Sequence, residues 1–167
     1  MEVTVRDAHG QGIGDCRVHA SMTAPAFAFG SAVNEPAWLG KVHSWAFGER
    51  YRQEFRRLFD TAVFESDMKW TQWVEGAADN HSATLGVVHD LQSSGIRIRG
   101  HNLVWPTCNS SGHVPGSVCS AAIKRNDTAG RQAVEKAILA HIKDEVTTLA
   151  AHGCEHVHSI MRSHLSA

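Results

Sequence analysis

The sequence predicts a parallel β/α architecture, and two features carry this prediction. Short apolar runs alternate with longer amphipathic segments in the order strand, helix, strand, helix, strand, helix. A helix between two strands lets the chain cross over the sheet and return in the same direction, so successive strands would run parallel. The 167 residues suit about one domain of this kind.

The composition excludes several classes of protein. Hydrophobic residues make up 43% of the chain and charged residues 20%, which is typical of a globular protein. The 16 Lys and Arg are balanced by 17 Asp and Glu, so the basic excess of a phosphate-binding surface is missing and we expect no nucleic-acid partner. No apolar run approaches the roughly 20 residues of a membrane-spanning helix, and we expect no membrane partner. The first residues do not read as a secretory signal, so the sequence leaves the localisation unknown.

Two alternating runs near the start predict a pair of antiparallel strands. Residues 2–6 and 17–21 alternate polar and apolar side chains, and the segment between them is rich in turn-forming residues. Such a pair is marginal in water by itself. We interpret residues 1–24 as the end of a β-sandwich-like module whose other strands are missing, and the family resemblance given below implies that it is an accessory β-module.

The elements that follow are predicted from their apolar spacing. Residues 26–33 and 61–65 are short, nearly continuous apolar runs, as expected of buried strands. A third strand opens at Ile96 and runs on to Trp105. Amphipathic helices are predicted over residues 49–59, 82–93 and 129–151. Their apolar positions are Tyr51, Phe55, Leu58 and Phe59; then Leu85, Val88, His89 and Leu91; then Val134, Ile138, Ile142 and Leu149.

The four cysteines do not form a recognisable framework. They are Cys16, Cys108, Cys119 and Cys154, and no two have the spacing of a structural zinc site. Cys108 and Cys119 bracket part of a long loop predicted over residues 106–128, and the sequence leaves open whether they pair. Loops of that length are usually functional or flexible.

Polar and aromatic side chains gather where two of the predicted strands end. Glu65, Lys69 and Trp70 follow the second strand, and His101 and Trp105 lie along the continuation of the third. In parallel β/α folds the residues that leave the carboxyl ends of strands face the ligand site. Sugars need ring faces for their C–H surfaces and charged or imidazole groups for their hydroxyls. The sequence therefore predicts a polar ligand site.

Each of these residues has a simpler explanation when it is taken singly. A Glu or Lys after a strand is commonly a solvated loop residue, a Trp commonly packs in a core, and a His commonly has a structural partner. The recurrence of the pattern after two successive strands favours a site over these explanations.

Three motifs resemble glycoside hydrolase family 10, the endo-β-1,4-xylanases. The family patterns F-x-F-G-[ST]-A, E-N-x-M-K-W and R-G-H-x-L-V-W match residues 27–32, 65–70 and 99–105 in this order. The resemblance covers residues 25–150 and implies the first three units of an eight-fold β/α (TIM) barrel, over residues 25–151. It implies an enzyme that hydrolyses internal bonds of xylan with retention, needs no cofactor and binds xylan or xylo-oligosaccharides. Export is expected because that polymer lies outside the cell.

The resemblance also implies a role for each candidate residue. Glu65 and Lys69 would bind the sugar two units on the non-reducing side of the cut. His101 would bind the sugar next to the cut, Trp105 would wall that subsite and Trp70 would support the pocket. Two positions depart from the family pattern: Ser66 replaces a sugar-binding Asn, and Pro106 replaces a His.

Both catalytic glutamates of the family are missing from these 167 residues. Retention requires two carboxyls about 5–5.5 Å apart, and the resemblance places the first in a W-D-V-V-N-E segment near residues 152–165. No such segment is present, and nothing around Glu155 matches it. We therefore assign no catalytic residue, and we expect this chain to be inactive alone.

The tail at residues 152–167 reads as atypical, a foreign or out-of-frame end in place of the fourth strand. An alternative is a metal cluster, because His152, Cys154, His156 and His158 alternate as on one face of a strand. We prefer the first interpretation and predict no metal. Two other functions stay open for the chain: a carbohydrate-binding remnant that does not cut, and a β/α-barrel glycosidase that acts on another β-glycan.

Overall fold

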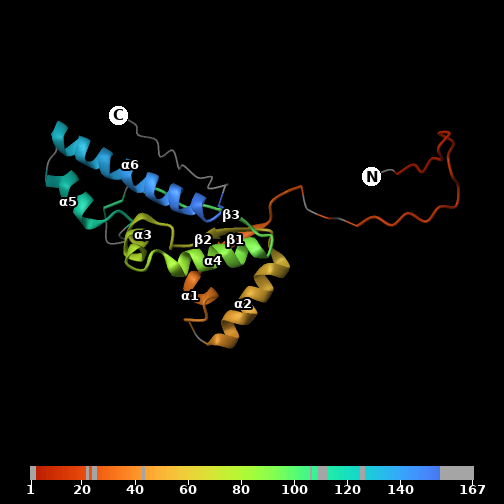
Figure 1. Cartoon of the computed structure of the whole chain (residues 1–167), viewed down its shortest axis with the longest axis horizontal. Helices are drawn as coiled ribbons and strands as arrows, with labels where there is room; N and C mark the ends of the chain where they lie inside the picture. Colours follow the sequence, from red (N-terminus) through yellow and green to blue (C-terminus); the bar gives the residue numbers. More distant parts are fainter. Residues whose placement is uncertain are drawn as a thin grey trace.

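Over the residues that it describes, a computed structural model places three parallel strands and seven helical segments around one main core. Figure 1 shows this body, with the first residues of the chain extending away from it. The structure describes residues 3–21, 23, 26–42, 44–105, 107–108, 113–124 and 127–154. Among these residues, none of the helices combines the length and the apolar character that crossing a bilayer takes.

The sheet has the order β1-β2-β3, with both pairs parallel. Gly30 in β1 lies opposite Thr61 in β2, and a Cβ at Gly30 would come within 2.7 Å of the Thr61 carbonyl oxygen. The close approach of the two backbones therefore requires glycine at this position. The strands are β1 (Gly30–Val33), β2 (Thr61–Phe64) and β3 (Arg97–Arg99).

Helices alternate with the strands, and several begin at a side-chain cap. Asn34 caps α1 (Glu35–Trp38), Ser44 caps α2 (Trp45–Leu58) and Asp127 caps α6 (Thr128–Ala151), each accepting from a backbone N–H of the first turn. Between β2 and β3 lie α3 (Trp70–Gly76), the 3-10 turn η1 (Ala77–Asp79) and α4 (Ser82–Ser93). A short helix α5 (Gly116–Lys124) precedes α6.

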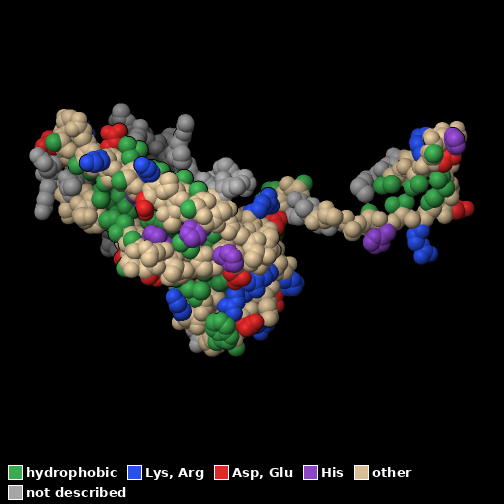
Figure 2. Space-filling view, in the orientation of Figure 1, with side chains coloured by type: hydrophobic (Ala, Val, Ile, Leu, Met, Phe, Trp, Pro, Cys, Tyr) green, Lys and Arg blue, Asp and Glu red, His purple; other side chains and the backbone are tan. Residues whose placement is uncertain are grey.

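Side-chain bonds join neighbouring helices into one layer. Figure 1 shows α4 between α2 and α6. Arg56 of α2 donates to Asp90 of α4 at 2.6 Å, and Gln92 of α4 donates to the carbonyl of Gly153 just after α6 at 2.9 Å. Figure 2 shows further Lys and Arg side chains gathered over α2.

The main core lies between the sheet and these helices. Its largest fully buried side chains include Trp38, Trp73 and Phe64. The buried members of the cluster are Val33, Trp38, Phe55, Ala62, Phe64, Met68, Trp73, Val87, Val88, Leu91, Ile96, Leu149 and Cys154. A smaller cluster of Trp70, Val114 and Cys119 lies beside it, packed on α5 and α6. The described residues thus form an α/β unit with an open sheet, and no closed barrel is present among them.

Most of the predicted elements are confirmed. The helices predicted over residues 49–59, 82–93 and 129–151 correspond to α2, α4 and α6, and the strand predicted over residues 61–65 corresponds to β2. Parallel pairing of all three strands is confirmed as well.

Three strand predictions need correction. The first strand spans Gly30–Val33 rather than residues 26–33, and Phe27 and Phe29 are exposed because β1 is an outer strand. The third strand ends at Arg99 instead of running on to Trp105. Near the start, a single bridge joins Arg6 to Gly12 among the described residues, and residues 17–21 form no strand because the turn closes earlier than predicted.

Candidate functional site

Glu65 and Asn34 meet at the carboxyl ends of β1 and β2. Each residue directly follows its strand, and the register pairs Val33 with Phe64, so the two side chains leave the sheet at the same height. Asn34 Nδ2 donates to Glu65 Oε2 at 2.9 Å. Glu65 is exposed, so a ligand can reach its carboxylate.

Lys69 and Trp105 form the second contact of the site. Lys69 is the residue before α3, and its Nζ lies 5.7 Å from the centre of the Trp105 ring. Trp105 is 37% exposed, and the ring of His113 stacks on it at 4.6 Å. One indole face and one ammonium group are therefore held together although they come from different strand ends.

His101 lies near Lys69, at the continuation of β3. Burial lowers the pKa of His101, and the positive charges of Arg99 and Lys69 lower it further. The Nδ1 atom of His101 is buried, and it has no hydrogen-bond partner among the described residues. At neutral pH the imidazole is therefore uncharged and able to exchange hydrogen bonds with a hydroxyl group.

Asp67 connects the two halves of this group electrostatically. Burial raises the pKa of Asp67, the charge of Glu65 raises it as well, and the charge of Lys69 lowers it. Glu65 and Lys69 are thus both close enough to act on the same carboxyl. The structure brings Glu65, Lys69, His101 and Trp105 to one end of the sheet.

Trp70 differs from the other four candidates because it is buried. Only 4% of its surface is exposed, and its ring stacks on His141 with the centroids 4.7 Å apart and the planes 3° apart. His141 lies in α6, so the stack joins α6 to the first residue of α3, which directly follows Lys69. Trp70 is thus a buried packing residue that links the start of α3 to α6.

His141, one ring of this stack, also forms a buried polar pair with Glu145. The Nε2 atom of His141 lies 2.7 Å from the carbonyl oxygen of Leu103 and 3.3 Å from Glu145 Oε2. Burial raises the pKa of Glu145 to about 8, with the charge of Asp144 acting in the same direction. Burial lowers the pKa of His141. Both groups are therefore predominantly neutral at pH 7.

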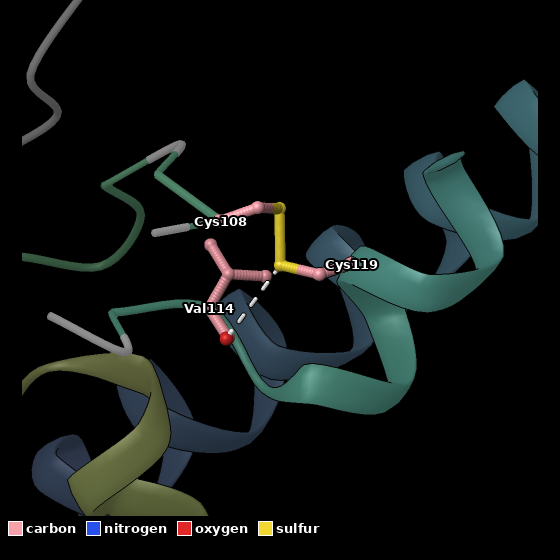
Figure 3. Close-up of a disulfide and its surroundings, with 3 residues drawn as sticks. All are labelled: Cys108, Val114 and Cys119. Carbon is pink, nitrogen blue, oxygen red and sulfur yellow. Dashed lines mark hydrogen bonds between the residues drawn. A yellow bond between two sulfur atoms is a disulfide. The ribbon is translucent and has the colours of Figure 1, made fainter. Parts of the chain in front are cut away.

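A disulfide holds the segment that follows Trp105. Cys108 and Cys119 are bonded, which settles the pairing that the sequence left open. Figure 3 shows the bond linking the loop to α5, with Cys119 Sγ near the carbonyl oxygen of Val114 at 3.8 Å. Cys119 and Val114 also pack in the cluster of Trp70. The disulfide thus connects the segment after Trp105 to the cluster in which Trp70 packs.

Two features of the site go beyond what the sequence predicts. Asn34 was not predicted as a site residue, although an Asn directly before Glu35 and Pro36 is a recognisable helix start. The segment predicted as a loop over residues 106–128 contains α5 and contributes His113 to the Trp105 stack.

The metal alternative gains no support from the residues that are described. Among them, no three His, Cys, Asp or Glu side chains are arranged to hold a metal ion. His156 and His158, two of the four residues of that alternative, lie outside the described part of the chain, as do Glu155 and Pro106.

A parallel α/β unit that presents carboxylate, ammonium, imidazole and indole groups at its strand ends fits the class of β/α-domain glycoside hydrolases. The profile of glycosyl hydrolase family 10 matches residues 19–159. This match spans most of the chain, and the chain belongs to that family.

One curated relative is an anti-sigma-I factor, RsgI6, from Acetivibrio thermocellus. It is 25% identical to this chain over 114 residues, which cover 63% of the chain and 13% of the relative. The chain therefore spans about one eighth of the length of that protein. No solved structure matches the chain.

Proposed function

We propose that the chain provides the glycone-binding half of an endo-β-1,4-xylanase cleft, which binds xylan or xylo-oligosaccharides. The observation that carries this proposal is the Lys69–Trp105 contact, with His101 and Glu65 at the same end of the sheet. Membership of the family supports a glycoside hydrolase activity for the protein to which such a unit belongs.

Each group has a task that suits a sugar ring. The exposed part of the Trp105 ring offers an apolar surface to the C–H groups, and the Lys69 ammonium donates to oxygen atoms. Neutral His101 both donates and accepts, and the Glu65 carboxylate accepts from hydroxyls. Trp70 holds this surface in place through its stack on His141.

In the whole enzyme, hydrolysis would proceed with retention. One Glu would attack the anomeric carbon while a second protonates the leaving oxygen and later activates water. We assign neither role to a residue of this chain. The 167 residues alone are expected to bind sugar without cutting it.

Two measurements test the proposal. Xylo-oligosaccharides should quench or shift the tryptophan fluorescence of the purified chain saturably, and cello-oligosaccharides should do so more weakly. Incubation with xylan should release no reducing sugar above the level of a heat-denatured sample. Equal response to both sugars would favour a different β-glycan, and the absence of any saturable response would contradict the proposed binding site.

A second candidate function is a carbohydrate-binding unit that takes no part in hydrolysis, and a relative whose name is not that of a glycosidase is compatible with it. That relative is described as an anti-sigma-I factor rather than as a glycosidase. Under this candidate the same four side chains bind the sugar. The two candidates separate when the chain is examined within its full-length protein, where only the first predicts release of xylo-oligosaccharides.

A further inference from the structure

Both the oxygen and the nitrogen of the Asn34 side-chain amide form hydrogen bonds. Its Oδ1 accepts from the backbone N–H of Ala37 at 2.9 Å and so caps α1. Its Nδ2 donates to Glu65 Oε2 at 2.9 Å. Its backbone N–H donates to the hydroxyl oxygen of Tyr51 at 3.2 Å.

The cap decides which end of the amide faces Glu65. A helix N-terminus presents N–H groups, so only the amide oxygen can satisfy it. The nitrogen is left to point along the edge of the sheet, toward the strand end that carries Glu65. A flipped amide would face an N–H with its own NH₂ group and a carboxylate with its own oxygen, and both contacts would be lost.

We propose that Asn34 is a positioning residue, which orients the Glu65 carboxylate for the hydroxyl groups of the bound sugar. This inference rests on the proposed function, in which Glu65 is a sugar ligand. Glu65 is exposed and has a flexible side chain, so its free carboxylate would sample several rotamers. A donor fixed by a helix start holds one carboxylate oxygen in place, and the remaining acceptor positions then face the ligand without further ordering.

The substitution Asn34→Asp separates this role from the structural one. Asp caps a helix about as well as Asn, so α1 and the fold should be kept. The donor to Glu65 becomes a second carboxylate at hydrogen-bond distance, which repels Glu65 and displaces it. At pH 7 we expect the affinity for a xylo-oligosaccharide to fall about tenfold relative to wild type.

Acid should rescue this variant. Two carboxyls at such a distance share a proton once the pH is low enough, and the protonated carboxyl introduced at position 34 then donates to Glu65 as the amide does in wild type. The ratio of variant to wild-type affinity should therefore approach one as the pH is lowered. A purely structural defect would give a ratio that does not change with pH.

A second variant and a matched control complete the test. Asn34→Ser also keeps a capping hydroxyl but has no group long enough to reach Glu65, so it should bind weakly at every pH. Asn80→Asp makes the same chemical change at an exposed turn after η1 and should bind as wild type does.

The outcomes distinguish this inference from the proposed function. If the wild-type chain binds no xylo-oligosaccharide, the proposed function fails and the inference falls with it. If wild type binds and Asn34→Asp binds equally well at pH 7, or shows a loss that acid does not reverse, the inference alone is wrong.

Discussion

The ammonium group of Lys69 lies 5.7 Å from the centre of the Trp105 ring. The two residues follow different strands, and the loop that carries Trp105 is held by its stack on His113 and by the nearby disulfide. A cation over a ring face contributes about 0.5–1 kcal/mol where it is exposed. This contact therefore contributes more to the shape of the site than to the stability of the fold.

Replacing Trp105 by Ala should weaken sugar binding without unfolding the chain. The Trp105 side chain is partly exposed and belongs to neither core cluster, so its loss removes the proposed ligand surface and little of the core. We expect the affinity for xylo-oligosaccharides to fall about tenfold, with a change in the free energy of unfolding of about 0.5 kcal/mol. Trp45, which is 65% exposed on α2, provides the matched control. Trp45→Ala should leave binding unchanged, and an equal loss in both variants would mean that the fluorescence reports nonspecific association.

Replacing Glu145 by Gln should remove a pH dependence of stability. The pKa of Glu145 is raised to about 8 by burial, so between its unfolded value and pH 8 the folded state holds a proton that the unfolded state releases. Stability therefore falls as the pH rises, by about 1.4 kcal/mol per unit.

The window from about pH 6.5 to 8 isolates this effect. Burial lowers the pKa of His141, so His141 costs stability only on the acid side of its unfolded pKa of about 6.5. Urea unfolding across the window should show a falling stability for wild type and a flatter profile for Glu145→Gln. Parallel profiles would show that Glu145 is ionised in the folded chain.

Removing the Cys108–Cys119 disulfide should loosen the segment that follows Trp105. The bond closes a loop with a sequence separation of 11 residues, and the chain-entropy argument gives about 3 kcal/mol for loops of this size. We expect Cys108→Ser to lower the melting temperature and to speed proteolysis after Trp105. Cys16→Ser, at an exposed free cysteine, is the control and should change neither. Identical proteolysis of both variants would show that packing of Cys119, rather than the bond, holds this segment.

Tyr51 should titrate above its usual pKa of about 10. Burial raises its pKa most, and the charge of Glu65 adds to the shift, while the hydrogen bond from Asn34 opposes it. Tyr51 is the single tyrosine of the chain, so the ultraviolet absorbance of the phenolate reports on this residue alone. A midpoint at or below about 10 would show that the hydroxyl is solvated.

The helices and strands could be predicted from the sequence more accurately than their boundaries and buried faces. The apolar spacing in α4 identifies the helix, yet it placed His89 on the inner face, where the structure buries Thr84 and Val87 instead. Apolar periodicity indicates that a segment is helical more reliably than it indicates which face of the helix is buried. Likewise, the apolar run that begins at Ala26 does not reveal that its first residues flank an outer strand.

The structure brings four of the predicted residues to one end of the sheet, and the sequence left the contacts between them open. The predicted elements include no helix over residues 70–76, where the structure has α3. Asn34 is recognisable as a helix cap, but its bond to Glu65 depends on the register of two strands far apart in sequence. Register of this kind follows from tertiary packing, which a single sequence does not contain.

Gly30 and Asn34 stand at opposite ends of the same short strand. The glycine permits the backbone of β1 to approach Thr61, and this pairing fixes how far β1 extends along β2. A slip by one residue would move Asn34 about 3.3 Å and turn its side chain to the other face. A methyl group added at Gly30 would thus act at a distance, because it would displace the amide that donates to Glu65 and, under the proposed function, change which sugar hydroxyls that carboxylate can reach.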